Sequence, residues 1–241
     1  MKKIAFIPAR YAATRFPGKL MQKIGDQTII SMVYKNAVSM KLFDDVMVVT
    51  DSDIIYDEIK KIGGTVIKSN KDHQSGSDRI AEACEQIDVD IIVNIQGDEP
   101  FIKKQPLEDL IKCFENSNVS VASLMQKFPE NESYENSNIV KVVCNKKNDA
   151  LYFSRSVIPY KRNKEVEEVL YRHIGVYAYR KDALLKFTKW PMGILEKTEM
   201  LEQLRYLENG ISIRMVETDE ASVGIDTPED LKKAIAFYNK L

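Results

Sequence analysis

Short apolar segments rich in isoleucine and valine alternate with stretches of helical period along the first half of this chain. The apolar segments cover residues 4–7, 46–50, 65–67, 91–95 and 119–124, and the helical stretches cover about 28–40, 52–62, 77–87 and 104–115. Strands that are apolar on both faces and separated by helices predict a mostly parallel sheet that is covered on both sides. In such α/β sheets, ligands bind at the carboxyl ends of the strands.

The pattern changes after about residue 125. Residues 139–143, 150–153 and 174–179 predict longer strands, for which antiparallel pairing is open, with a charged loop at 161–168. Helices at about 181–189 and 196–208 and a strand at 211–216 follow. The closing helix has Thr227 as its expected N-cap, Pro228 at its first position and Asp230 three residues after the cap. We expect one domain over residues 1–241, with an inserted substrate-binding or dimerisation region at about 126–180.

Composition excludes several classes of protein. The chain carries 35 Lys and Arg against 36 Asp and Glu, so it lacks the positive field that binding to a long nucleic acid requires. Three widely spaced cysteines, Cys84, Cys113 and Cys144, form no zinc pattern and predict reduced thiols. No apolar run reaches the length of a membrane span or a signal peptide, so we expect a cytoplasmic protein that does not bind membranes.

A cationic loop follows the first predicted strand. Residues 1–25 contain six Lys and Arg and no acid, and Arg10, Arg15 and Lys19 lie close together among them. Two arginines and a lysine suit a triphosphate, which needs several donors and a spread of positive charge. The loop is not a Walker motif, because Leu20 stands where Ser or Thr is required. A solvated basic loop explains the same charges, and both interpretations remain open from the residues alone.

Acidic side chains follow at two distant places. Asp98 and Glu99 come after the predicted strand at 91–95, and Asp226 precedes the closing helix. A carboxylate at the end of a strand can hold Mg²⁺, a hard cation that needs few protein oxygens when phosphates are present. From the residues alone, each acid is better explained as a residue that stabilises the start of a helix, and a metal pair is the alternative interpretation.

Two further segments combine polar side chains with small ones. Residues 73–79 form a turn that leads into a helix, where backbone N–H groups and hydroxyls can bind a base or a phosphate. In the predicted strand at 174–179 and just before it, His173, Gly175 and Tyr177 fall on one side by period two. A plain helix start and a satisfied core histidine are the structural alternatives.

Seven segments in order resemble the 3-deoxy-manno-octulosonate cytidylyltransferase (CMP-Kdo synthetase) family. They are IPARYAATRFPGK at 7–19, HQSGSDR at 73–79, NIQGDEP at 94–100, ALYFSR at 150–155, RHIGVYAYR at 172–180, EMLEQLR at 199–205 and GIDTPEDL at 224–231. The resemblance spans nearly the whole chain. It implies a Rossmann-like nucleotide-diphospho-sugar transferase fold and a homodimer.

The resemblance also implies an activity: transfer of CMP from CTP to Kdo, with Mg²⁺, for lipopolysaccharide or capsule synthesis. Arg10, Arg15, Lys19, Ser75 and Arg79 would bind CTP, and Lys19 would act in catalysis with Asp98 and Asp226, the two metal ligands. The expected sugar-acid residues are Gln96, Arg155, His173, Tyr177 and Glu202. The alternatives are another acidic sugar, such as 8-amino-Kdo or a nonulosonic acid, and a non-catalytic nucleotide-binding protein.

Overall fold

The apolar segments of the first half of the chain are strands, as their composition predicts. The computed structural model describes residues 1–12, 16–71, 73, 75–128, 132–167, 169–220 and 224–240. Their backbone divides into two units, Met1–Lys104 with Ser222–Leu241, and Gln105–Ala221. The second unit therefore begins earlier and ends later than the region at 126–180 that the sequence set apart.

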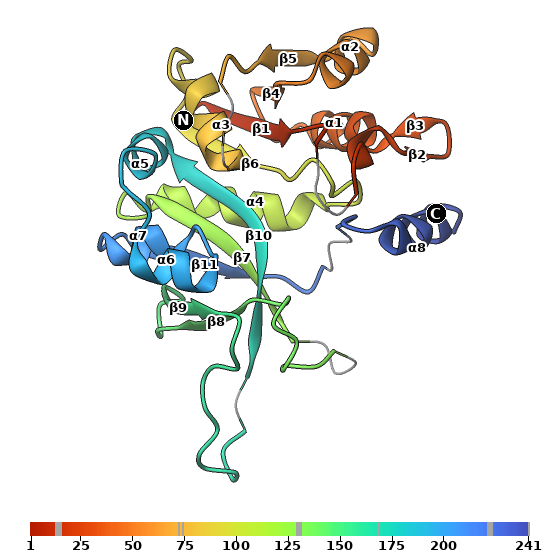
Figure 1. Cartoon of the computed structure of the whole chain (residues 1–241). Coiled ribbons are helices and arrows are strands. Elements are labelled where there is room, and N and C mark those ends of the chain that lie inside the picture. Colours follow the sequence, from red (N-terminus) through yellow and green to blue (C-terminus); the bar gives the residue numbers. More distant parts are fainter. Residues whose placement is uncertain are drawn as a thin grey trace. The chain divides into compact units, whose positions relative to one another are not determined.

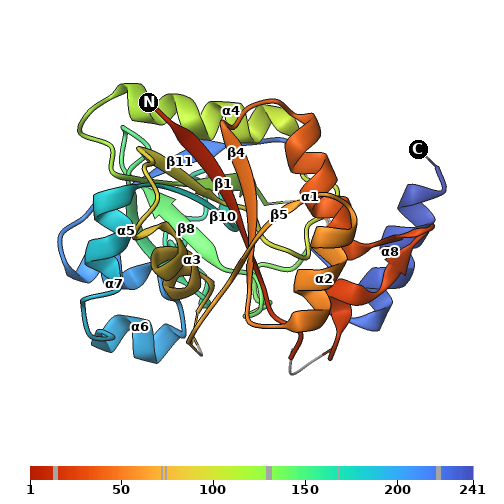
Figure 2. The same cartoon turned by 90° about the horizontal axis from the view of Figure 1, so that it is seen from above.

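The first unit contains a parallel sheet. Its strands are β1 (Lys3–Ala9), β4 (Asp45–Thr50), β5 (Thr65–Lys68) and β6 (Ile91–Asn94), and its helices are α1 (Ile29–Ser39), α2 (Asp53–Lys61), α3 (Gly76–Cys84) and α8 (Pro228–Tyr238). β1 lies between β6 and β4, so that Ala5 is opposite both Val93 and Val46, and β5 continues beyond β4. Figure 2 shows β4 between β1 and β5. This is the sheet that the apolar segments predicted.

Hydroxyl side chains start the helices of this unit. Thr28, Ser52 and Ser75 are the N-caps of α1, α2 and α3, and each side chain accepts a backbone N–H of the first turn. α1 connects β1 to its neighbour β4, and α2 connects β4 to β5 at the edge of the sheet. α3 connects β5 to β6, which lies on the other side of β1. Because such crossovers are right-handed, α3 covers the face opposite to α1 and α2. The strand order reverses at β1, which is where ligands bind in this class of sheet.

The end of the chain follows the prediction closely. Thr227 caps α8, Pro228 occupies its first turn, and Asp230 completes a capping box with the Thr227 backbone. A short hairpin of β2 (Lys23–Ile24) and β3 (Gln27–Thr28) was not predicted, because two-residue strands are too short to show a period.

The second unit is built around a long strand. Its elements are α4 (Lys104–Lys112), which begins at the last residue of the first unit, a 3₁₀ turn at Cys113–Glu115, β7 (Val121–Lys127), β8 (Lys141–Cys144), β9 (Ala150–Ser154), β10 (Tyr171–Arg180), α5 (Lys181–Phe187), α6 (Ile194–Glu199), α7 (Leu204–Glu208) and β11 (Ile213–Glu217). β10 pairs antiparallel with β7 and β8, β8 pairs antiparallel with β9, and β11 is parallel to β7 (Figure 1). The mixed, mostly parallel α/β fold class is thereby confirmed.

The single helix expected at 196–208 is wrong. Met200 adopts a left-handed conformation with φ of 54°, which ends α6, and α7 begins at Leu204. A buried ion pair joins the two helices: Arg205 Nη2 and Nε donate to the Glu196 carboxylate at 2.6 and 2.7 Å. The exposed fractions of these side chains are 7% and 2%. Helical period in the sequence does not distinguish two short helices bridged in this way from one longer helix.

The sequence also predicts reduced cysteines and no membrane-spanning segment. Cys84, Cys113 and Cys144 are free, as expected, and Cys84 is buried. Within the described residues, every helix is too short or too polar to cross a membrane.

Candidate functional site

The loop after β1 carries the predicted cationic side chains. Arg10 follows β1 directly and is exposed, whereas Arg15 lies outside the described residues. Gly18 has a φ of 68°, a conformation that favours glycine, and its N–H donates to the Tyr11 carbonyl at 3.0 Å. The chain then enters a 3₁₀ turn, Lys19–Met21. The Lys19 side chain is only 14% exposed, so the solvated-loop interpretation does not fit it.

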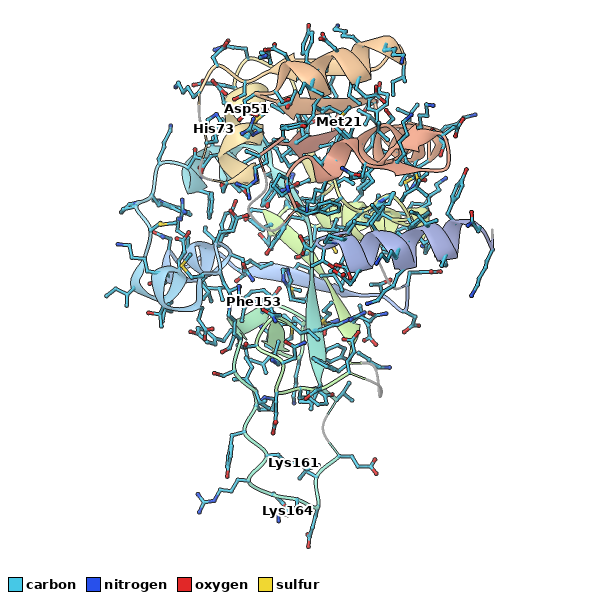
Figure 3. All side chains as sticks on the ribbon, turned by 45° about the vertical axis from the view of Figure 1, so that its right-hand side comes forward. Met21, Asp51, His73, Phe153, Lys161 and Lys164 are labelled. Carbon is cyan, nitrogen blue, oxygen red and sulfur yellow. The ribbon has the colours of Figure 1, made fainter. Side chains whose placement is uncertain are left out.

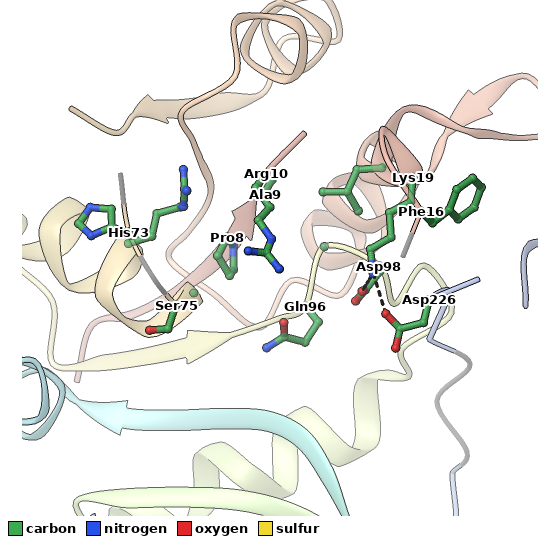
Figure 4. Close-up of a pocket in the computed structure, with 14 residues that line it drawn as sticks. Pro8, Ala9, Arg10, Phe16, Lys19, His73, Ser75, Gln96, Asp98 and Asp226 are labelled. Atoms are coloured by element: carbon green, nitrogen blue, oxygen red, sulfur yellow. Dashed lines mark hydrogen bonds and ion pairs between the residues drawn. The ribbon is translucent and has the colours of Figure 1, made fainter. Parts of the chain in front are cut away.

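Asp98 and Asp226 come together although they are far apart in the sequence. The backbone N–H of Ile225 donates to the Asp98 carbonyl oxygen at 3.0 Å, which ties the loop after β6 to the segment before α8. Lys19 Nζ donates to the carboxylates of both Asp98 and Asp226, the latter at 2.9 Å (Figure 4). Both acids therefore meet a cation from the loop after β1, and Asp226 in addition stands next to the N-cap of α8.

The charge of Lys19 is stabilised by this arrangement. Burial by itself lowers the pKa of the Lys19 ammonium group. The charges and hydrogen bonds of Asp98 and Asp226 outweigh burial, and the pKa lies above its ordinary value of 10.5. Lys19 is consequently a permanent cation between two carboxylates.

A glycine allows the loops after β1 and β6 to approach. A Cβ atom on Gly97 would lie 3.1 Å from the Pro8 carbonyl oxygen and 3.3 Å from a Leu20 methyl group. A side chain at this position would push Asp98 away from the end of β1.

A cavity of about 380 Å³ opens at these strand ends. Described residues expected around CTP, the metal and the sugar acid line it together: Arg10, Lys19, Ser75, Arg79, Gln96, Asp98 and Asp226 (Figure 4). Ser75 also caps α3, accepting the Asp78 N–H at 3.2 Å. The turn at 73–79 is thus both a helix start and a wall of the cavity. Gln96, expected with the sugar acid, shares this cavity with the residues expected around CTP.

The pair of acids fits a divalent cation of the magnesium type. The Lys19 ammonium group already places a positive charge between them, and carboxylate oxygens are hard donors. Among the described residues there is no group of three or more His, Cys, Asp or Glu that could hold a metal ion. Mg²⁺ does not need one, because it binds through one or two carboxylates when phosphates and water supply the remaining oxygens. Asp98 and Asp226 are the residues that would hold it.

A second cluster of predicted residues lies in the second unit. The rings of His173 and Tyr177 are 5.4 Å apart on β10, on the same side of the strand although the β10–β7 register shifts between Ile174 and Tyr177. Burial, together with the charges of Tyr179 and Glu202, raises the pKa of Tyr177 well above 10, which keeps its hydroxyl protonated. His173, Tyr177 and Glu202 thus belong to one neighbourhood.

The hydrogen bonds of Ser123 assign the tautomer of His173. The Ser123 hydroxyl lies 2.8 Å from the Val176 carbonyl oxygen and 3.2 Å from that of Ile174, and both can only accept. Its single proton is used there, so Ser123 accepts from His173 Nε2 at 2.9 Å. His173 Nδ1 is then an acceptor.

Arg155 is held mainly by backbone groups. Its Nε donates to the Glu199 carbonyl at 2.8 Å and its Nη1 to the Ser137 carbonyl at 3.0 Å. The buried Lys141 supports the same turn, donating to the Arg155 carbonyl at 2.8 Å. These contacts give Arg155 a structural role in its loop.

Sequence reasoning missed two acidic side chains that contact residues of the segment 73–79. Asp51 pairs with Arg79 at 2.8 Å, and Glu82 contacts His73 at 2.7 Å. Asp51 directly follows β4, so its place at the carboxyl end of a parallel strand was the available signal. Glu82 carried no such signal, because packing decides which side chains of a helix face a neighbouring turn.

The lowered pKa of His173 predicts a pH dependence of stability. Burial lowers the pKa of His173 to about 3, whereas an unfolded histidine titrates near 6.5. Between these values the unfolded chain binds a proton that the folded chain does not, so stability falls as the pH falls through 6.5. When the pH is lowered from 7 to 5, the contribution of this residue reduces the free energy of unfolding by about 2 kcal/mol.

Chemical denaturation of the wild type and His173→Asn at both pH values measures this contribution. We expect the free energy of unfolding to change less with pH in the variant than in the wild type. Equal changes in the two proteins would contradict the low pKa of His173.

Comparison with known proteins gives the chain a family context. A family model described as cytidylyltransferase matches residues 4–213. A Flavobacterium johnsoniae protein named 3-deoxy-manno-octulosonate cytidylyltransferase is 56% identical, and the match covers 100% of both chains. A Christiangramia forsetii protein of the same name is 53% identical over 96% of this chain and 94% of its own.

A solved structure is similar over its whole length. It is described as CMP:2-keto-3-deoxy-manno-octonic acid synthetase complexed with CTP, and it matches with a TM-score of 0.94 at 38% identity. The match covers 100% of this chain and 99% of the solved one.

Proposed function

The chain belongs to the 3-deoxy-manno-octulosonate cytidylyltransferase family, and we propose that it transfers CMP from CTP to the anomeric hydroxyl of Kdo, releasing pyrophosphate. The observation that carries this proposal is the contact of Lys19 with Asp98 and Asp226 in a cavity at the carboxyl ends of β1 and β6. Cations and carboxylates side by side suit a reaction that moves a phosphoryl group and binds a metal.

The chemistry is an in-line displacement at the α-phosphorus of CTP. The oxygen of the sugar's anomeric hydroxyl forms the new bond to the α-phosphorus and its proton passes to water. The bond from the α-phosphorus to the bridging oxygen breaks, and pyrophosphate leaves with that electron pair. Lys19, with Arg10 and Arg15, neutralises the negative charge that grows on the leaving group. When bound at Asp98 and Asp226, Mg²⁺ would lower the pKa of the attacking hydroxyl and offset charge at the α-phosphate.

Several polar side chains are proposed to bind the sugar acid. His173, Tyr177 and Glu202 supply an acceptor nitrogen, a protonated hydroxyl and a carboxylate, which suit the several hydroxyls of a sugar. Gln96 and Arg155 complete the proposed set. Arg155 has the weakest support, because backbone carbonyls already accept from its guanidinium group.

A pyrophosphate-release assay tests the proposed reaction. The purified chain is incubated with CTP, Mg²⁺ and one sugar acid from a panel of Kdo, 8-amino-Kdo and a nonulosonic acid. Release with Kdo in preference to the others supports the proposal. Release with another member reassigns the sugar, and no release with any of them identifies a binding protein without this activity.

Lys19→Ala should mainly weaken the use of CTP. The substitution removes a charged donor, a group whose hydrogen bonds contribute roughly 1.5–3 kcal/mol, so kcat/KM for CTP should fall about 10- to 100-fold. Steady-state kinetics with varied CTP at saturating Kdo measure this. Lys23→Ala, an exposed lysine on β2, is the matched control and should leave the constant unchanged. A loss confined to the KM for Kdo would contradict the assignment.

The proposed homodimer is supported by the loop between β9 and β10. In its described residues, large apolar side chains are exposed: Val157 by 41%, Tyr160 by 86%, Val166 by 53% and Val169 by 57%. Figure 3 shows Lys161 and Lys164 at the far end of this loop. Large apolar side chains gathered on one exposed loop are typical of a surface that a partner covers.

Sedimentation analysis tests the dimer. We expect two copies per particle for the wild type. The Tyr160→Ser dimer should dissociate at a higher protein concentration than the wild-type dimer. Lys164→Ser, in the same loop, controls for changes in loop composition. A wild-type monomer at micromolar concentration would refute the dimer.

The proposal places the enzyme in the cytoplasm, where CTP is available and the free thiols remain reduced. Its product would serve lipopolysaccharide synthesis, with capsule synthesis as the alternative.

A further inference from the structure

A buried serine contacts the side chains that are proposed to bind the sugar acid. Ser123 on β7 has no exposed surface, and the β10–β7 register places it directly opposite Tyr177. Its hydroxyl oxygen lies 2.9 Å from His173 Nε2. Because Ser123 is buried, any effect that it has on a ligand must act through these neighbours.

An irregularity in β10 directs two carbonyl groups at Ser123. The register against β7 shifts between Ile174 and Tyr177, so the extra residues of β10 form a bulge there. The Ser123 hydroxyl oxygen lies 2.8 Å from the Val176 carbonyl oxygen and 3.2 Å from that of Ile174. Both carbonyls can only accept, so the hydroxyl proton is directed to the bulge, and His173 meets a lone pair of the serine oxygen.

This distribution of protons decides which nitrogen of His173 is an acceptor. Ser123 accepts from Nε2, so Nε2 carries the ring proton. Burial lowers the pKa of His173 to about 3, which keeps the ring neutral near pH 7, and Nδ1 is then the acceptor. The ring packs between those of Phe153 and Tyr177, with centres at 5.1 and 5.4 Å, and these contacts restrict its rotation.

A neutral acceptor recognises a different part of a sugar acid than a cation does. A doubly protonated imidazole would pair with the carboxylate of the sugar. The lone pair on Nδ1 of His173 instead accepts a hydrogen bond from a hydroxyl group, whereas an ionised carboxylate has no proton to donate. The tautomer therefore determines which group of the sugar His173 can bind.

We propose that Ser123 is a positioning residue for sugar binding, which holds the Nε2–H of His173 so that Nδ1 accepts a hydrogen bond from a hydroxyl group of the sugar acid. The inference rests on the proposed function, because it takes the sugar acid as the ligand of His173. It adds a residue to the site and assigns His173 to a hydroxyl group and not to the carboxylate.

Nitrogen NMR of the histidine rings tests the tautomer directly. The chain contains two histidines, so isotope labelling of histidine gives signals from two rings, and the His73→Asn variant retains those of His173. We expect His173 in the wild type to carry its proton at Nε2 alone. In Ser123→Ala the acceptor is lost, and both tautomers should be populated. A wild-type His173 that is protonated at Nδ1 would overturn the inference.

Steady-state kinetics connect the tautomer with sugar binding. Ser123→Ala should raise the KM for Kdo about 10-fold, the effect of one weakened hydrogen bond, and leave the KM for CTP unchanged, because CTP is assigned to other side chains. Ser123→Thr keeps the hydroxyl group and should retain most of the wild-type KM for Kdo. Equal increases in both KM values, or an unchanged KM for Kdo in folded Ser123→Ala, would overturn the inference.

Deoxy analogues of Kdo identify the hydroxyl group that His173 binds. Each analogue lacks one hydroxyl group, and kcat/KM is compared between the wild type and His173→Phe, which keeps a ring but removes the acceptor. Removal of the partner hydroxyl should lower kcat/KM about 10-fold in the wild type and have little effect in the variant. If every analogue has the same relative effect in both proteins, His173 does not accept from a hydroxyl group and the inference is wrong.

Ser31→Ala is the matched control for loss of a buried serine. Ser31 on α1 is 2% exposed, and its hydroxyl oxygen lies 2.8 Å from Thr28 Oγ1 and 2.9 Å from Glu58 Oε1. Its replacement should lower the thermal midpoint as Ser123→Ala does, but both KM values should stay at the wild-type level. If Ser123→Ala does not fold, the wild-type tautomer and the kinetics of His173→Phe still decide the inference.

The outcomes separate this inference from the proposed function. Pyrophosphate release with Kdo, combined with the other tautomer or with an unchanged KM for Kdo in Ser123→Ala, would overturn the inference and leave the proposed function standing. No release with any sugar acid of the panel would overturn the proposed function, and with it the sugar as the ligand of His173, whichever tautomer is found.

Discussion

Replacement of Asp98 by asparagine is expected to lower turnover about a thousandfold while the fold survives. Asp98 contacts Lys19 and lies beside Asp226, the other proposed metal ligand. The variant keeps the shape of the side chain and removes its charge, so a divalent cation loses one of its two carboxylates. Loss of about 4 kcal/mol of transition-state stabilisation, the several kcal/mol that a bound metal supplies, corresponds to that factor.

A measurement of folding must accompany the kinetics of Asp98→Asn. Far-UV circular dichroism and the thermal midpoint should stay close to the wild type, because Asp98 is partly exposed and its backbone contact with Ile225 is retained. Asp182→Asn, an exposed aspartate on α5, is the control and should turn over normally. A folded Asp98→Asn enzyme with nearly full activity would rule out catalysis through a metal at this position.

Glu196→Ala is expected to produce the largest loss of stability. The substitution leaves Arg205 buried without its carboxylate, and breaking a buried ion pair in this way destabilises a protein by roughly 3–5 kcal/mol. The carbonyls of Phe187 and Trp190, which also accept from Arg205 at 3.3 and 3.4 Å, do not replace a bidentate carboxylate. Urea denaturation followed by fluorescence of Trp190 gives the free energy of unfolding.

A double substitution distinguishes a lost ion pair from a damaged core. Glu196→Leu combined with Arg205→Met replaces both charges by apolar side chains, and it should recover most of the stability lost in Glu196→Ala. The Arg205 guanidinium group lies 4.1 Å from the centre of the Phe187 ring, so an apolar group there keeps a packing partner. A double variant as unstable as Glu196→Ala would mean that packing, and not charge, explains the loss.

Much of the fold was predictable because its signals are local. Apolar residues in β1, β4 and β6 are buried on both faces of a parallel sheet, and that burial requires the Ile and Val runs seen in the sequence. The capping box of α8 was predictable for the same reason, since its partners are three residues apart. The break at Met200 was not, because a left-handed methionine has no signature in composition.

The candidate site was predictable only through the resemblance of ordered motifs. The residues alone favoured helix capping for Asp98 and Asp226 over a metal pair, because spacing along a chain does not reveal which side chains meet in space. The structure brings both to Lys19, and it shows that Gln96 lines the same cavity. It does not change the family assignment, which the comparisons confirm.

The sequence by itself determined the class of the fold and its central strands, and it supplied the proposed residues of the site. These depend on apolar period, caps and motif order, which are properties of neighbouring residues. Only the tertiary structure decided which charges meet: Lys19 with Asp98 and Asp226, Arg79 with Asp51, and His73 with Glu82. Such contacts join distant or differently folded segments, and they form only when the sheet and its helices have packed.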